Sequence, residues 1–146
     1  MPQLSNKPVD VANRLRPVLL HLNRHLRREV HKSGVSAGQL SLLGLIEGNP
    51  GIGVADLASR EGMSMPSVCS HIDRLEASGL VTRRQAERDR RRVDLEVTDE
   101  GGRVLRAIRT KRTAWLSARL GNLAEGDLAA VAAAIAPLEA LLVEGV

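Results

Sequence analysis

The stretch LASREGMSMPSVCSHIDRLEASGLVTRRQAERDRRRVDLEVTDEG, residues 57–101, decides the fold. It opens inside a short helix predicted over residues 54–61, which Gly62 ends because glycine adopts the positive φ of a tight turn at low cost. Ser64 has the side chain of an N-cap residue, so a second helix is predicted over about 64–78. Two short helices joined by a glycine turn form a helix-turn-helix.

The second of these helices has one apolar and one polar face. Val68, Ile72 and Leu75 fall on one side at about 100° per residue, and with Leu57 and Met63 they are predicted to form a small core. The opposite side carries only small, polar or charged residues: Pro66, Ser67, Ser70, Asp73, Arg74 and Ala77. This polar face is suited to the major groove of DNA, which admits one helix.

A hairpin with a basic loop follows the two helices. Residues 80–82 and 93–97 have the pattern of short strands, and residues 83–92 between them contain six arginines and two acids. Arginines on such a loop can bind phosphates or enter the minor groove beside a recognition helix. The sequence thus predicts a mainly α fold with a small antiparallel β wing, a winged helix-turn-helix. A solvated arginine-rich loop without a partner is the alternative.

A long helix is predicted before this lobe. Between residues 10 and 32, apolar residues repeat along one helical stripe: Leu15, Leu19, Leu22, Leu26 and Val30. Residues 1–10 are expected to form a loose arm. Pro17 is expected to kink the helix or to mark its true start.

Three further helices bring the predicted number to six. Ser36 begins a capping box with the glutamine three residues later, which starts a helix over residues 36–48. Thr98 caps a helix over residues 99–120. The last helix, over residues 124–143, has apolar residues spaced as in a heptad seam: Leu128, Val131, Ile135, Leu138 and Leu142.

Composition excludes several classes of protein. The 146 residues suffice for one domain, 1–146, and no apolar run approaches the length of about 18 residues that a membrane span needs, so no membrane partner is expected. The single cysteine excludes a disulfide scaffold, and the lack of Phe and Tyr excludes an aromatic platform for single-stranded nucleic acid. No phosphate loop, nucleophile elbow or metal-ligand cluster is present, so neither an enzyme nor a cofactor is expected. The N-terminus lacks the pattern of a secretory signal, which predicts a cytoplasmic protein.

The net charge of +4 is unevenly distributed. Residues 1–32 carry seven basic and two acidic residues, whereas residues 120–146 carry four acids and no basic residue. Together with the arginines of the predicted wing, this distribution favours a polyanionic partner.

The segments LASREGMSMPSVCSHIDRLEASGLVTRR and DRRRVDLEVTDEG resemble the winged-helix region of the MarR family, the multiple-antibiotic-resistance regulators. The DRL…GLV segment, the Asp89-x-Arg91 pair and the T-x-x-G that starts at Thr98 all match. The number and length of the flanking helices also agree, so the resemblance covers about residues 10–144.

The resemblance implies an obligate-type homodimer that binds double-stranded DNA at a pseudo-palindromic operator. Helices within residues 10–32 and 103–144 would form the dimer interface, and residues 36–98 the DNA-binding lobe. Many such proteins lose DNA affinity when a small, often phenolic or lipophilic, effector binds. The expected dimerisation residues are Leu15, Leu19, Leu22, Leu128, Val131, Ile135, Leu138 and Leu142.

The resemblance also assigns DNA contacts residue by residue. Arg74 matches an arginine of the recognition helix, Arg91 matches the wing arginine that enters the minor groove, and Asp89 matches the acid that holds this arginine in place. Ser70 stands where relatives often have a basic residue, which puts one base contact of the family in doubt. The predicted DNA-binding residues are Ser64, Pro66, Ser67, Cys69, Ser70, Arg74, Arg88, Asp89, Arg90 and Arg91.

Two of these assignments have structural alternatives. Arg74 could be a surface arginine paired with Asp73 or Glu76 on the same helix. Asp89 could be an ordinary acid at the tip of the wing.

Three other sites have two interpretations each. Cys69 is either a redox sensor or a residue without a sensing role, which is a small hydrophobe beside the core or a thiol that faces DNA. His21 and His25, four residues apart, could bind a metal or respond to pH, or they are polar residues near a dimer seam; nothing in the sequence completes a zinc site. Trp115 is either core or interface packing or a stack for a ligand.

The functional hypothesis is a sequence-specific transcription regulator, a repressor that a small molecule releases. The alternative is a winged helix that binds protein, or one that binds DNA constitutively without a ligand response.

Overall fold

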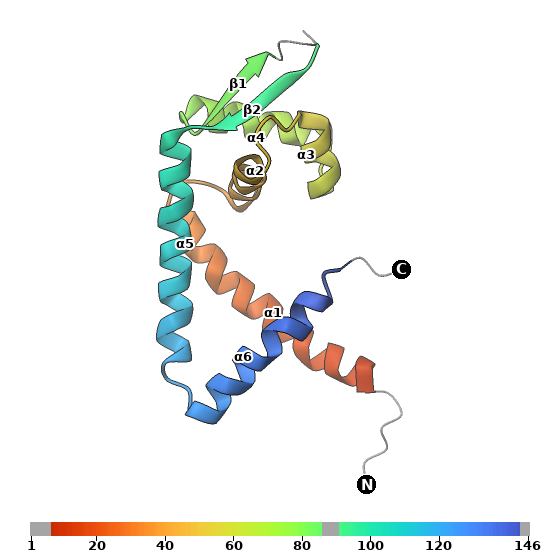
Figure 1. The fold of residues 1–146 in the computed structure, drawn as a ribbon, viewed down its shortest axis with the longest axis vertical. Helices are drawn as coiled ribbons and strands as arrows, with labels where there is room; N and C mark the ends of the chain where they lie inside the picture. Colours follow the sequence, from red (N-terminus) through yellow and green to blue (C-terminus); the bar gives the residue numbers. More distant parts are fainter. Residues whose placement is uncertain (1–6, 86–90, 144–146) are drawn as a thin grey trace. The chain divides into compact units, whose positions relative to one another are not determined.

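The computed structural model describes residues 7–85 and 91–143 (Figure 1). This part of the chain contains six helices and one two-stranded antiparallel sheet, as the sequence predicts. The elements are α1 (Lys7–His31), α2 (Ala37–Gly48), α3 (Val54–Glu61), α4 (Met65–Ala77), β1 (Val81–Gln85), β2 (Val93–Val97), α5 (Asp99–Leu120) and α6 (Glu125–Ala140). The chain divides into two compact units between Thr110 and Lys111, within α5.

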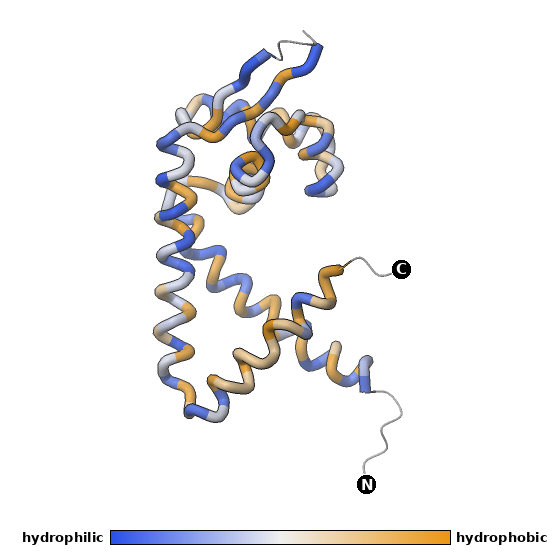
Figure 2. Tube along the Cα trace, in the orientation of Figure 1, coloured by the Kyte–Doolittle hydropathy of each residue, from blue (hydrophilic) through white to orange (hydrophobic). Residues whose placement is uncertain are grey.

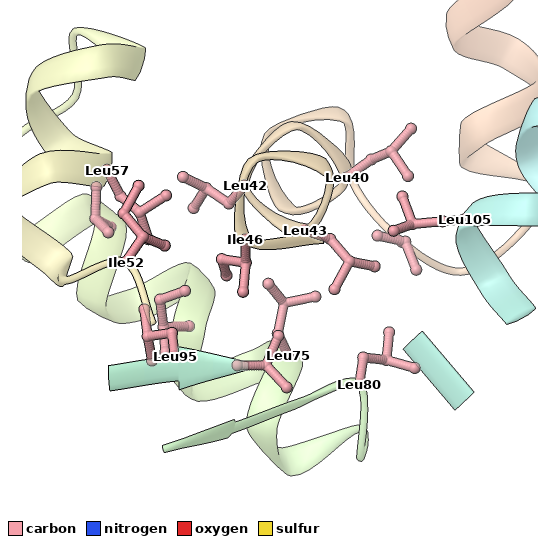
Figure 3. Close-up of a cluster of buried hydrophobic side chains, with 14 of the residues drawn as sticks. Leu40, Leu42, Leu43, Ile46, Ile52, Leu57, Leu75, Leu80, Leu95 and Leu105 are labelled. Carbon is pink, nitrogen blue, oxygen red and sulfur yellow. The ribbon is translucent and has the colours of Figure 1, made fainter. Parts of the chain in front are cut away.

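The core of the first unit is aliphatic, because the chain has no Phe or Tyr. Figure 3 shows α2 in the middle of this core, with Leu42 pointing toward Leu57 of α3 and Leu40 pointing toward Leu105 of α5. Each fully buried Leu or Ile stabilises the fold by about 1.5–3 kcal/mol relative to an exposed one. The fully buried side chains are those of Val30, Leu42, Leu43, Ile46, Leu57, Val68, Ile72, Leu75, Val81, Leu95 and Ile108.

The helix ends follow from local side-chain chemistry. Ser36 Oγ accepts a hydrogen bond from the Gln39 amide at 3.1 Å, and Gln39 Oε1 accepts one from the Ser36 amide at 3.4 Å, so the predicted capping box is confirmed. Ser64 caps α4 as predicted, and Gly62 ends α3 at φ +61°. This left-handed turn sets the angle at which α4 leaves α3.

The first strand is longer than predicted. Instead of residues 80–82, β1 covers Val81–Gln85, and it pairs with β2 from Val81↔Val97 to Gln85↔Val93. The residues typical of strands end at Thr82, and polar residues follow it, so the sequence pattern assigned the next residues to the loop. Pairing with β2 provides the backbone hydrogen bonds that keep Arg83 and Arg84 extended.

Thr98 joins the hairpin to both neighbouring helices. Its hydroxyl donates to the carbonyl oxygen of Gly79 at 2.6 Å and accepts from the amide of Gly101 at 3.0 Å. A Cβ on Gly101 would lie 2.7 Å from Val97 Cγ1 and still closer to the carbonyl oxygen of Leu80. The T-x-x-G motif is therefore a close contact between the start of α5 and the base of the wing.

Gly101→Ala is expected to lower the free energy of unfolding by about 1–3 kcal/mol, because the backbone of Leu80 has to move to admit the methyl group. Thermal or urea unfolding measures the change. Gly102→Ala is the matched control: its Cβ would lie 3.2 Å from the mobile end of Arg106, and alanine favours a helix over glycine. Equal stability of wild type and Gly101→Ala would contradict the close-contact explanation.

The beginning of α1 differs from the prediction. The helix starts at Lys7, so residues 7–10 are not a loose arm, and Pro17 lies in its interior and does not mark its start. Pro8 falls in the first turn, where amide hydrogens have no acceptor within the helix, and proline costs little there.

The second unit consists of the last turns of α5 together with the whole of α6. Figure 2 shows α6 as predominantly apolar, yet none of its residues is buried in the described chain. The helix ends at Ala140 and not at residue 143. Leu142 therefore lies beyond the helix, 83% exposed, and the predicted helical seam stops at Leu138.

Candidate nucleic-acid interface

The structure gives α4 the two faces that the sequence predicts. Its buried residues are Val68, Ile72 and Leu75, which pack into the core of the first unit. The predicted contact residues of α4 and its cap are exposed, apart from Cys69, which is half-buried: Ser64, Pro66, Ser67, Ser70 and Arg74. The polar face is thus open to solvent along the helix.

The start of α4 is held by its own serines. Ser64 Oγ accepts from the Ser67 amide at 3.3 Å and donates to Ser67 Oγ at 2.9 Å. These bonds orient both hydroxyls at the helix N-terminus, where amide hydrogens and the helix dipole favour an anion such as a phosphate.

Arg74 carries an uncommitted guanidinium on this face. Within residues 7–85 and 91–143 its side chain forms no hydrogen bond or ion pair. The alternative that it pairs with Asp73 or Glu76 is wrong, because residues one and two positions apart on a helix do not face each other. Five fixed N–H donors on an exposed helix suit a bidentate contact with guanine or with a phosphate.

The carboxylates of α4 pair instead with the wing. Arg83 of β1 places Nη2 2.6 Å from Asp73 Oδ1 and Nη1 3.5 Å from Glu76 Oε1. Arg83 is not among the predicted site residues, because the strand pattern ended at Thr82 and left Arg83 in the predicted loop. In the structure, β1 extends to Gln85 and places Arg83 beside α4.

Arg91 and Arg92 lie exposed immediately before β2, at the loop end of the hairpin. Arg92 Nε lies 3.5 Å from Asp94 Oδ1, which leaves its other nitrogens available for further contacts. Three predicted contact residues, Arg88, Asp89 and Arg90, lie outside the described residues, as does the expected pairing of Asp89 with Arg91.

A groove of about 450 Å³ lies between the first residues of α3 and α4 and the loop end of the wing, and Asp56 of α3 is its one acidic lining residue. Met65 of α4 and Val54 of α3 line it together with Arg91 and Arg92. A concave surface with two guanidinium groups beside the first turn of α4 is suited to the phosphate backbone.

The structure provides no metal-ligand cluster among the described residues at the histidines, and it adds little to the two interpretations of Cys69 and Trp115. The rings of His21 and His25 are 5.1 Å apart, but no cluster of three metal-binding side chains occurs in the described part. Cys69 is a free cysteine beside the core. Arg119 lies 3.8 Å above the ring of Trp115, a cation–π contact that covers one face of the indole.

The predicted dimerisation residues remain largely exposed. On α1, Leu19 and Leu22 are exposed and Leu15 is half-buried. In the second unit, the exposed fractions are 40% for Leu128 and 54% for Ile135. Val131 is also exposed, and Leu138 is half-buried.

A second cavity, of about 550 Å³, lies within the first unit where α2 ends and α5 begins. Ile46, Pro50 and Val97 are its apolar residues, and its lining is otherwise mostly polar, with five charged side chains: Glu47, Glu96, Asp99, Arg103 and Arg106. Its size is in the range of small-molecule sites.

No helix of the described chain meets the length and hydropathy required to cross a membrane.

A helix-turn-helix with an exposed polar helix beside an arginine-bearing hairpin defines a winged-helix DNA-binding protein. Residues 33–92 match the MarR family. The HTH-type transcriptional regulator MT0903.1 of Mycobacterium tuberculosis is 33% identical over 113 residues, which are 77% of this chain and 79% of that protein. The chain belongs to the MarR family of transcription regulators, which are DNA-binding proteins and not enzymes.

Two further similarities extend over most of the chain. The HTH-type transcriptional repressor MdtR of Bacillus subtilis is 27% identical over 119 residues, 82% of this chain and 77% of MdtR. The crystal structure of YusO from Bacillus subtilis superposes with a TM-score of 0.76 at 26% identity, covering 94% of this chain and 97% of YusO. The six-helix winged fold is thus common to this chain and to solved relatives.

Proposed function

We propose that the chain is a cytoplasmic repressor that binds a specific double-stranded DNA sequence as a homodimer and leaves it when a small molecule binds. The observation that carries the proposal is the exposed face of α4, with Arg74 unpaired among the described residues, beside the arginines of the wing. Residues 36–98 would form the DNA-binding lobe. Two such lobes about 34 Å apart would read a pseudo-palindromic operator.

The apolar surface supports the homodimer. Leu19 and Leu22 are exposed on α1 of the first unit, and Leu128, Val131 and Ile135 are exposed on α6 of the second unit. Exposed apolar residues grouped on a helix are typical of a surface that a partner covers. In the second unit, Arg112 Nε is buried and has no hydrogen-bond partner among the described residues, and desolvation lowers the pKa of its guanidinium. A buried donor without an acceptor costs about 1–3 kcal/mol, which an acceptor from a second copy would recover. Helices within 10–32 and 103–144 are therefore the proposed interface.

Repression and release have separate support. The relative MdtR is named a transcriptional repressor, which favours repression here. The 550 Å³ cavity beside the start of α5 is large enough for a small phenolic or lipophilic effector. Ile46 and Val97 offer it apolar contacts, and Arg106 offers a cationic partner for a phenolate oxygen. A ligand would weaken DNA binding only by its differential affinity for the bound and free conformations. Constitutive DNA binding without a ligand response is the alternative.

Fluorescence anisotropy on labelled DNA from the upstream intergenic region, with scrambled DNA as competitor at two salt concentrations, tests the proposal. Tight binding that resists the competitor and weakens with salt is expected. Equal affinity for the scrambled DNA would contradict regulation at this promoter and favour a protein-binding winged helix. Small phenols added to the complex test release, and an unchanged anisotropy across the series favours the constitutive alternative.

Arg91→Ala is expected to weaken binding and to flatten the salt dependence of log affinity by about 0.9 per lost phosphate contact in each protomer. The same anisotropy titration at several salt concentrations measures both effects. Arg119→Ala is the control for charge, because it removes one positive charge at the far end of α5, where the Arg119 side chain covers Trp115. The salt dependence of this control is expected to stay close to that of the wild type. An unchanged slope in Arg91→Ala would refute the role of the wing arginine.

A further inference from the structure

The ion pairs of Arg83 connect the wing to the recognition helix. Its cross-strand partner is Leu95, which is fully buried, so Arg83 is on the side of the hairpin that covers the core. Only 33% of the Arg83 side chain is exposed, whereas Asp73 and Glu76 are 64% and 41% exposed. One guanidinium thus contacts two carboxylates of α4 across the junction with β1.

The geometry favours arginine specifically. Its two terminal nitrogens contact different carboxylates, at 2.6 Å and 3.5 Å, which the single ammonium of lysine cannot reproduce with the same fixed spacing. Asp73 and Glu76 are three residues apart, so they lie on one flank of α4. Two contact points along the flank fix the direction of the strand as well as its distance from the helix.

The two carboxylates, Asp73 and Glu76, would also repel DNA phosphates that approach α4. Asp73 is adjacent in sequence to Arg74, and an unneutralised carboxylate near the phosphates repels them. Arg83 neutralises this charge from the side of the wing, so the phosphates near Arg74 meet less repulsion from the two carboxylates.

We propose that Arg83 is a positioning residue for DNA binding: by bridging Asp73 and Glu76, it sets the wing against α4 and neutralises the acids beside Arg74. The inference rests on the proposed DNA-binding function and adds a residue that acts through others. In the operator complex, Arg83 makes the contacts of Arg74 and of Arg91 interdependent.

Arg83→Ala and Arg84→Ala test the proposal on the same operator. Arg84 is the neighbouring residue on the other side of the strand, is exposed, and forms no ion pair with the described residues. Both variants lose one positive charge per protomer. Arg83→Ala is expected to weaken operator binding by about tenfold or more relative to Arg84→Ala, as coupled residues do. Thermal unfolding should show little change, since exposed ion pairs contribute little to stability.

A double-mutant cycle separates positioning from a general loss of charge. If Arg83 orients the wing, Arg91→Ala should weaken binding much less in the Arg83→Ala background than in the wild type. Arg83→Lys should recover part of the affinity, and Asp73→Asn with Glu76→Gln should also recover part in the Arg83→Ala background, because the repulsion is removed.

Two results overturn the inference. One is equal loss of affinity in Arg83→Ala and Arg84→Ala. The other is independent, multiplicative effects of Arg83→Ala and Arg91→Ala. A wild-type protein that binds operator and scrambled DNA equally would instead refute the proposed function, so the two failures are distinguishable.

Discussion

Ile135→Asp is expected to dissociate the proposed homodimer and, with it, to abolish tight operator binding. Ile135 is 54% exposed in the protomer, so the protomer itself tolerates the carboxylate, whereas an interface would bury it. Each dimer would contain two such charges, and burying an ion costs several kcal/mol. At about 1.4 kcal/mol per factor of ten, the dimer dissociation constant is expected to rise by roughly a thousandfold or more.

Sedimentation velocity measures the oligomeric state, and anisotropy measures the consequence for DNA. Leu128→Asp should give the same result, because Leu128 is on the same apolar side of α6 and is near the N-terminus of the helix, where an acid is well tolerated. Ala133→Asp is the matched control: it adds the same charge in the same helix, about 200° around the axis from Ile135. Intact dimers in both Ile135→Asp and Leu128→Asp would refute α6 as the interface.

The second large effect is expected from Arg74→Ala. A bidentate arginine contact with a base is worth about 1–3 kcal/mol, and a dimer makes it twice. We therefore expect operator affinity to fall by roughly thirtyfold or more, with a smaller loss on scrambled DNA, so that the ratio of the two affinities decreases. Competition anisotropy on both DNAs measures this ratio.

Arg103→Ala provides the control for charge. Arg103 is exposed on α5 and pairs with Glu100 at 2.6 Å, so its removal lowers the net charge equally without touching α4. A uniform loss on both DNAs in Arg74→Ala would make Arg74 a phosphate contact. Unchanged affinity would remove Arg74 from the interface.

The helices of the first unit were predictable because their signals are local. The Ser36 capping box, the Ser64 cap and the left-handed Gly62 each act within three or four residues of the backbone they fix. The inward stripe of α4 follows from the 3.6-residue repeat, and it packs into the aliphatic core.

The length of β1 and the role of Arg83 were missed because distant parts of the chain decide them, whereas the misplaced ends of α1 and α6 are errors of helix bounds. β1 extends to Gln85 because β2 supplies hydrogen bonds from residues about ten positions away. The contact of Arg83 with Asp73 and Glu76 spans ten and seven residues, and no repeat in the sequence connects them. α6 ends at Ala140, which leaves Leu142 outside the seam that the spacing predicted.

The sequence by itself determined the order of the elements, the apolar stripes, the basic character of the wing and the family, because each is encoded in caps, periodicity and short motifs. The tertiary structure decided which acids Arg83 binds, that Arg74 has no partner in the described chain, and that the start of α5 needs glycine against Leu80. These features depend on distances between segments far apart in the chain, and only folding brings such segments together.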